Sequence, residues 1–167
     1  MKQLTNLYDL LNHEIQMLHN VEKWQIASLP RMIKKTSNPR LQEAFEQHLE
    51  DTKVHKHRLE VISKILNIDP AGEGNPAIKG MIAEGEKIIH KNATPETRDA
   101  ALIATAQKIE HYEIAGYGTA AYVAQQLGLM RIGELLDITL QEEQATDTIL
   151  NIIAKAEVNI AADLAYA

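Results

Sequence analysis

Four long segments with apolar residues at helical spacing constrain the fold of this chain most strongly. They run from near residue 3 past residue 28, from about 39 to 66, from about 94 to 128 and from about 132 to 154. In each segment the apolar residues fall on one stripe at about 100° per residue, as in an amphipathic helix. Helices with one apolar stripe must bury it against one another. The sequence therefore predicts an all-α fold.

The connections group these helices into two hairpins. Ser37-Asn38-Pro39 supplies a cap and a first-turn proline for the second helix, and a turn near residue 129 joins the third helix to the fourth. Between the hairpins, residues 67–76 contain two Gly and two Pro and are predicted to be a loop, followed by a short helix over 77–90. Pro30 is expected to bend or locally break the first helix.

Two helical hairpins joined by a long crossover are what a ferritin-like four-helix bundle requires. We expect one ferritin-like domain over residues 1–167, with a short extra helix in the crossover.

Composition and charge exclude several classes of chemistry. The 17 Lys and Arg against 23 Asp and Glu give a net charge of −6, which argues against a nucleic-acid partner. The chain has no cysteine, so any metal must be held by nitrogen or oxygen atoms. No apolar run approaches the roughly 20 residues of a membrane span, and the N-terminus lacks the apolar core of a signal peptide. We expect a cytoplasmic protein without membrane contact.

Acidic residues and a histidine occupy the apolar stripes, where an ordinary amphipathic helix carries leucine. These positions are Glu22 in the first helix, His48 with Asp51 at the stripe edge in the second, Glu110 and Glu113 in the third, and Glu143 and Asp147 in the fourth. Several carboxylates in one interior repel one another and are costly to bury without partners. A multivalent cation among them would remove both problems.

The heights of these residues along the bundle also agree. Glu22 and Asp51 lie about 15 and about 14 residues from the turn near residue 37, a mismatch of roughly 1.5 Å at the helical rise. Glu113 and Glu143 lie about 16 and about 14 residues from the turn near residue 129. Glu110 and Asp147, the other acidic pair of that hairpin, also match in height. Each hairpin therefore supplies half of one site. Oxygen ligands with an imidazole suit iron or manganese better than zinc or calcium.

Three side chains allow two interpretations. His48 lies within about one turn of the height of Glu22, where it is either a ligand or a supporting hydrogen-bond donor. His55 lies about 10 Å further along its helix than His48, where packing or a supporting hydrogen bond is the better interpretation. Tyr117 shares the stripe of the third helix and is either plain core or a carrier of electrons or protons near the metal.

Four runs of sequence resemble the YciE/YciF family. They are Val21-Glu22-Lys23, Ala44-Phe45-Glu46-Gln47-His48-Leu49-Glu50-Asp51-Thr52, Glu110-His111-Tyr112-Glu113-Ile114-Ala115-Gly116-Tyr117-Gly118 and Glu142-Glu143-Gln144-Ala145-Thr146-Asp147. The resemblance covers about residues 7–154, and the run 110–118 is its most specific part. It implies a ferritin-like fold, a di-iron centre, a homodimer and an association with stress responses.

The resemblance also implies a ligand set, carried over position by position. The implied metal ligands are Glu22, His48, Asp51, Glu110, Glu113, Glu143 and Asp147. Members of the family usually show His-Leu-Glu-Glu-Thr where this chain has His48-Leu49-Glu50-Asp51-Thr52, so Asp51 is one methylene shorter. A bridging water is the alternative to its direct coordination.

Two functions of different classes fit these observations. The first is a di-iron oxidoreductase of the ferroxidase or peroxide-consuming kind, with O₂ or peroxide as its small-molecule substrate and Glu110 or Glu113 bridging two iron ions, manganese being the alternative metal. The second is a non-enzymatic helical dimer or scaffold whose acidic interior is hydrated or holds a structural metal site. DNA protection by a ferritin-like cage is disfavoured because the termini lack a basic arm.

Overall fold

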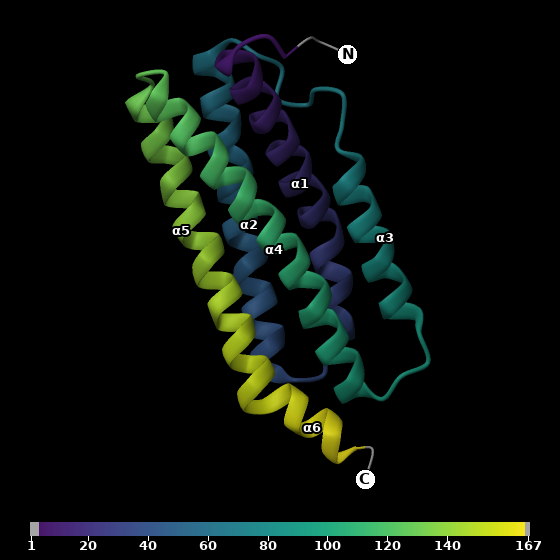
Figure 1. Cartoon of the computed structure of the whole chain (residues 1–167). Coiled ribbons are helices and arrows are strands. Elements are labelled where there is room, and N and C mark those ends of the chain that lie inside the picture. Colours follow the sequence, from purple (N-terminus) through teal and green to yellow (C-terminus); the bar gives the residue numbers. More distant parts are fainter. Residues whose placement is uncertain (1–3, 166–167) are drawn as a thin grey trace.

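The computed structural model describes residues 4–165, and every regular element in this range is helical. The bundle consists of α1 (Leu7–Lys35), α2 (Pro39–Leu66), α4 (Pro95–Gln126) and α5 (Met130–Ile153), with α3 (Pro76–His90) in the crossover and a π-helical turn (Ala154–Val158) leading into α6 (Asn159–Leu164). Figure 1 shows α3 outside the bundle, where it packs against α1 and α4. This confirms the predicted ferritin-like four-helix bundle with a short extra helix in its long crossover.

Side-chain caps begin the helices at the predicted places. The Asn38 side chain accepts a hydrogen bond from the Leu41 N–H before α2, and Thr94 accepts one from Thr97 before α4. A proline follows each cap, where its missing N–H has no intrahelical partner to lose. Gly128 adopts φ +73° in the turn between α4 and α5, a backbone conformation that favours glycine.

The first helix differs from expectation at its start, and one of the two outcomes predicted at Pro30 is absent. It begins at Leu7 behind an Asn6 cap rather than near residue 3; residues 1–3 lie outside the described range. Pro30 does not break the helix, since α1 continues to Lys35; a bend at Pro30 stays a prediction. Pro30 is exposed, so water can satisfy the carbonyl group four residues earlier that has lost its N–H partner.

The core has a polar layer between two apolar clusters. One cluster, near the α4–α5 turn, includes Leu11, Leu18, Leu59, Tyr117 and Leu136. The other, near the α1–α2 turn, includes Leu29, Phe45, Ile103, Leu150 and Ile153. Full burial of each such side chain stabilises the fold by roughly 1.5–3 kcal/mol, which offsets the cost of a polar layer between them.

No helix within residues 4–165 combines the length and the apolarity needed to cross a membrane.

Candidate metal centre

Six ionisable side chains from all four bundle helices meet in the polar layer. They are Glu22 of α1, His48 and His55 of α2, Glu110 and Glu113 of α4, and Glu143 of α5, and we call them the carboxylate–imidazole cluster. None of the six exposes more than 2% of its surface. Each replaces an apolar residue at a position where its helix faces the bundle axis, so the fold itself brings the six together.

Two groups of three within the cluster have the spacing of metal ligands. Glu22, His55 and Glu143 form one group, and His48, Glu110 and Glu143 form the other. Within each group the potential ligand atoms all lie within 4.8 Å of one another. Glu143 belongs to both groups. The cluster therefore has the arrangement of two adjacent cation sites that share one carboxylate.

The two imidazoles face different carboxylates. Nε2 of His48 lies 3.2 Å from Oε1 of Glu110. Nδ1 of His55 lies 2.8 Å from Oε1 of Glu143 and 3.8 Å from Oε1 of Glu22. Each histidine thus serves one of the two groups.

Neighbouring buried side chains hold the cluster in position. The Gln25 amide donates a hydrogen bond of 2.6 Å to Oε2 of Glu113, and its carbonyl oxygen lies 3.3 Å from Nε2 of His48. The Tyr117 hydroxyl donates to Oε1 of Glu22. These contacts fix the orientation of carboxylates that would otherwise rotate freely.

Burial raises the pKa values of three carboxyl groups in the cluster. It raises the pKa of Glu22 to about 8, with the charge of Glu143 adding to the rise. Burial raises the pKa of Glu110 to about 7, against the opposing charge of His48. The pKa of Glu113 lies well above its ordinary value because of burial and three neighbouring carboxylates. Without a cation, this cluster retains protons that exposed carboxyl groups would have lost.

The pKa values of the two histidines and of Glu143 shift so that the charged form of each side chain is favoured. Burial alone would lower the pKa of His48, but the Glu110 carboxylate beside it raises that pKa to about 10. Burial likewise opposes the charged form of His55, whose pKa is nevertheless raised by its hydrogen bond to Glu143. Against its own burial, the pKa of Glu143 is lowered by His55 and His48. The shared carboxylate is therefore the one that stays ionised.

Several buried oxygen and nitrogen atoms of the cluster have no hydrogen-bond partner within residues 4–165, and this bears on whether these residues fit a metal. Oε2 of Glu22, Oε1 of Glu113 and Nδ1 of His48 are buried without a hydrogen-bond partner among the described residues. Neither oxygen of Glu110 or Glu143 makes a hydrogen bond of good geometry within that range, although Glu110 and Glu143 form the close imidazole contacts given above. Buried polar atoms are normally satisfied. Oxygen and nitrogen atoms left over in this number fit a divalent cation.

Two predicted ligands lie outside the cluster. Asp51 is half-buried and accepts a hydrogen bond of 3.0 Å from Gln47, one turn earlier on α2. Asp147 accepts a hydrogen bond of 3.2 Å from Gln107, and its Oδ1 lies 3.4 Å from Nε2 of His111. Neither belongs to a group with ligand spacing in the described part of the chain; Glu113 belongs to neither group either, but unlike them it is fully buried within the cluster. The structure thus brings together five of the seven predicted positions.

His55 and Gln25 have larger roles at the cluster than the sequence suggested. His55 was expected to lie too far along α2, but side chains lean toward the N-terminus of their helix, so those of antiparallel helices lean in opposite directions. His55 and Glu22 therefore approach each other although their Cα atoms differ in height. The spacing of His48, Thr52 and His55 on one helical face was the available signal. Gln25 carried none, because a lone glutamine at a stripe edge is common.

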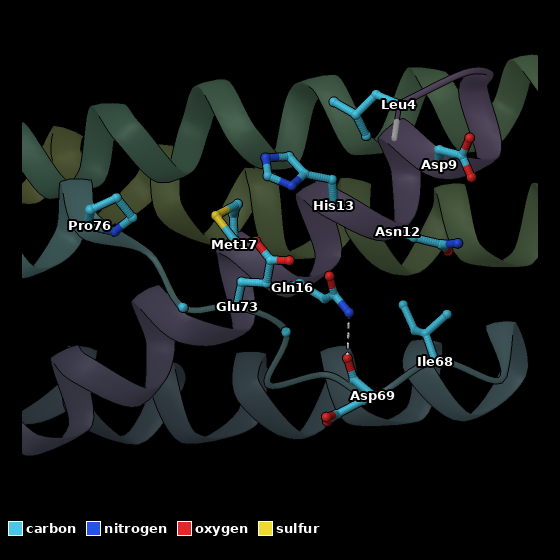
Figure 2. A pocket seen from close by; sticks show the side chains of 12 residues that line it. Leu4, Asp9, Asn12, His13, Gln16, Met17, Ile68, Asp69, Glu73 and Pro76 are labelled. Atoms are coloured by element: carbon cyan, nitrogen blue, oxygen red, sulfur yellow. Dashed lines mark hydrogen bonds between the residues drawn. The ribbon is translucent and has the colours of Figure 1, made fainter. Parts of the chain in front are cut away.

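A cavity of about 550 Å³ lies elsewhere, between α1 and the loop that joins α2 to α3. Figure 2 shows its lining, which includes His13, Met17 and Ile68, and the 2.8 Å hydrogen bond from Gln16 to the Asp69 carbonyl group. The cavity shares no residue with the carboxylate–imidazole cluster. The cavity and the cluster are therefore separate features of the described structure.

Comparisons with known proteins agree with the fold and cover almost the whole chain. YciF of Escherichia coli strain K12 is 39% identical over 157 residues, which are 93% of this chain and 95% of that protein. A crystal structure described as that of the E. coli stress protein YciF has a TM-score of 0.89 at 38% identity, covering 93% of this chain and 99% of that one. YcfI of Rhodopseudomonas palustris, described as a proposed structural protein, has a TM-score of 0.85 at 37% identity, covering 90% and 96%.

The family match has the same extent. Residues 6–163 match the family described as "Domain of unknown function (DUF892)". This match, together with the identity to YciF, agrees with the resemblance seen in the sequence. The chain therefore belongs to the DUF892 family, which is the YciE/YciF family that its helix motifs indicated.

Proposed function

We propose that this chain is a di-metal carboxylate protein that binds two iron ions and consumes O₂ or peroxide in a stress response. The observation that carries the proposal is the pair of ligand groups sharing Glu143. The proposed ligands are Glu22, His48, His55, Glu110, Glu113 and Glu143. Asp51 and Asp147 are left out of the proposed set because they hydrogen-bond to Gln47 and Gln107, and manganese is the alternative metal.

The side chains of the cluster have separate tasks in this proposal. Glu143 is the bridging carboxylate, in place of Glu110 or Glu113, because it alone belongs to both groups and stays ionised. Gln25 holds one oxygen of Glu113, so the other oxygen is the one free to bind. Tyr117 holds Glu22 and has a proton within reach of the cluster. Two Fe(II) ions, when bound, would supply the two electrons needed to reduce one peroxide to water.

Anaerobic loading with Fe(II) tests this function. We expect metal-free protein to take up two iron ions per chain and to oxidise them faster than buffer does when O₂ or H₂O₂ is added. The matched control is Glu143→Gln, which keeps the size of the side chain but removes the shared charge. Oxidation no faster than in buffer would exclude the redox function.

A second function is a non-enzymatic scaffold with a structural metal site. It is favoured by the complete burial of the cluster and by a described cavity that does not reach it. The description of the R. palustris relative as a proposed structural protein points the same way. In this case metal removal lowers the melting temperature while peroxide is not consumed, and catalytic peroxide consumption excludes it.

The homodimer is also a proposal, supported by membership of the family. Light scattering on purified protein checks it through the mass of the particle in solution. A mass of one chain at micromolar concentration would contradict it.

A further inference from the structure

The carboxylate–imidazole cluster is closed to solvent, so a cation can reach it only if a side chain moves. Most polar contacts of the cluster lead to other buried groups, such as Tyr117 and Gln25. One contact does not. Within residues 4–165, the pairing of His55 with Glu142 is the one hydrogen bond or ion pair found between the cluster and a side chain that reaches the surface: 41% of the Glu142 side chain is exposed.

Glu142 and Glu143 are consecutive residues on α5 with opposite surroundings. Consecutive side chains on a helix point about 100° apart, so Glu143 faces the bundle axis while Glu142 faces the seam between α2 and α5. The His55 ring stands between them. Its Nε2 lies 3.0 Å from Oε2 of Glu142, and its Nδ1 lies 2.8 Å from Oε1 of Glu143. One imidazole thus separates a solvent-facing carboxylate from the shared carboxylate of the cluster.

Arg58 holds Glu142 in the seam. Its Nη1 atom donates a hydrogen bond of 2.8 Å to Oε2 of Glu142 and another to the Thr139 hydroxyl group. The contacts of Glu142 with Arg58 and His55 both use Oε2, which leaves Oε1 for an arriving cation. The guanidinium therefore fixes the outer carboxylate without occupying it fully.

From this geometry we propose that the α2–α5 seam is the entrance through which a divalent cation reaches the cluster. Glu142 is the outer binding site, and rotation of the His55 side chain away from Glu142 opens the way to Glu143. Arg58 acts as a latch that restrains Glu142. This inference rests on the metal-binding function proposed above, and it concerns the rate of uptake, whereas that function concerns the final metal content.

Co²⁺ uptake by metal-free protein tests the entrance. Stopped-flow absorbance measures the rate, and elemental analysis after dialysis measures the final content. Glu142→Gln is compared with Glu134→Gln, which makes the same charge change at an exposed position two turns away on α5. We expect Glu142→Gln to slow uptake by about tenfold or more relative to that control, because a local carboxylate concentrates cations at the entrance, with unchanged final content and unchanged helical circular dichroism.

Arg58→Gln supplies a test in the opposite direction. It releases Glu142 and is expected to speed uptake relative to Lys53→Gln, which removes a positive charge from the exposed face of α2. If Arg58→Gln slows uptake or leaves its rate unchanged, Arg58 does not restrain entry at Glu142 and the proposed entrance is excluded.

Three further results would overturn the entrance. Equal uptake rates for Glu142→Gln and Glu134→Gln would overturn it. A second copy of the chain that covers the seam would produce this result. A lower final Co²⁺ content in Glu142→Gln would make Glu142 a ligand instead. Wild-type protein that binds no Co²⁺ at equilibrium would remove the proposed function and the entrance with it, whereas normal content with unaltered rates removes only the entrance.

Discussion

Glu143 is the side chain on which both ligand groups depend. It lies in each group, and the two histidines keep it ionised at neutral pH. Glu143→Gln keeps the volume but replaces the shared anion with a neutral amide, which is a poor ligand for cations. We expect the affinity for both metal ions to fall by more than about 100-fold, beyond the loss usual for a supporting partner. Titration with Mn²⁺, followed by the electron paramagnetic resonance of the free ion, measures this.

Asp147 provides the contrasting variant on the same helix. It bonds to Gln107 and lies beside His111 rather than in the cluster. We therefore expect Asp147→Asn to retain both ions in the same titration. Equal loss of metal in Asp147→Asn and Glu143→Gln would show that the ligand set implied by the family resemblance is right and that the described cluster is incomplete.

Tyr117 belongs to the apolar cluster near the α4–α5 turn and also contacts the carboxylate–imidazole cluster. Its hydroxyl group is buried and donates to Glu22, so Tyr117→Phe leaves a buried carboxylate oxygen without its donor. We expect the free energy of unfolding of metal-free protein to fall by about 1–3 kcal/mol. Urea denaturation checks this against Tyr122→Phe, because the exposed Tyr122 hydroxyl makes only a 3.4 Å bond to Thr119. A change of about 0.5 kcal/mol or less is expected for that control, and equal changes in both variants would contradict a special role for Tyr117.

The sequence revealed the charged residues of the site better than the neutral ones. A glutamate in an apolar stripe conflicts with the pattern, which is why Glu22, Glu110 and Glu143 could be identified. Gln25 creates no such conflict, and its role depends on where Glu113 and His48 end up in three dimensions. Asp51 and Asp147 were predicted from their place in or beside the apolar stripe, from their height and from the family resemblance. None of these says whether a side chain reaches the axis or hydrogen-bonds to a nearby amide, as Asp51 does to Gln47 and Asp147 to Gln107.

At the scale of elements, one carboxylate ties the α1–α2 turn to α4. Asp99 is 2% exposed and accepts backbone hydrogen bonds from Ser37 at 3.0 Å and from Asn38 at 2.7 Å. Asp99→Ala removes the acceptor for both N–H groups at the start of α2. We expect the free energy of unfolding to fall by about 1–3 kcal/mol, measured by urea denaturation. Glu43→Ala, which removes an exposed carboxylate on α2, should have almost no effect, and a similar loss there would argue against the turn contact.

Helix bounds were predictable where a cap and a proline coincide. Asn38-Pro39 and Thr94-Pro95 begin α2 and α4 as expected, since both residues of each pair favour a helix start. Pro30 was harder to interpret, because a proline within a helical pattern does not by itself say whether the helix ends, bends or continues. On the solvent face it removes one hydrogen bond that water can replace, and packing on either side keeps α1 continuous.

The whole molecule places a protonated polar layer between two apolar clusters, and this has a consequence for metal-free protein. The pKa of Glu22 is raised from 4.5 to about 8, and that of His48 from 6.5 to about 10. At a pH between its pKa in the unfolded state and its pKa in the folded state, such a group binds a proton only in the folded state. Stability therefore falls as pH rises through that window, by up to about 1.4 kcal/mol per pH unit for each group. The pKa of Glu143 is lowered, so this carboxyl group titrates at a pH below that window.

We accordingly expect the melting temperature of metal-free protein to fall between about pH 6.5 and about pH 8.5. The pKa of His19 is lowered, so the titration of His19 affects stability only below this range. Bound metal should have the opposite dependence, because it displaces these protons and binds the deprotonated ligands. The rise in melting temperature caused by saturating Mn²⁺ should therefore grow across the same range. Differential scanning calorimetry at the two pH values, with and without Mn²⁺, measures both trends. If metal-free protein is instead stabilised as pH rises and Mn²⁺ gives an equal shift at both values, the buried layer neither holds protons nor exchanges them for a cation.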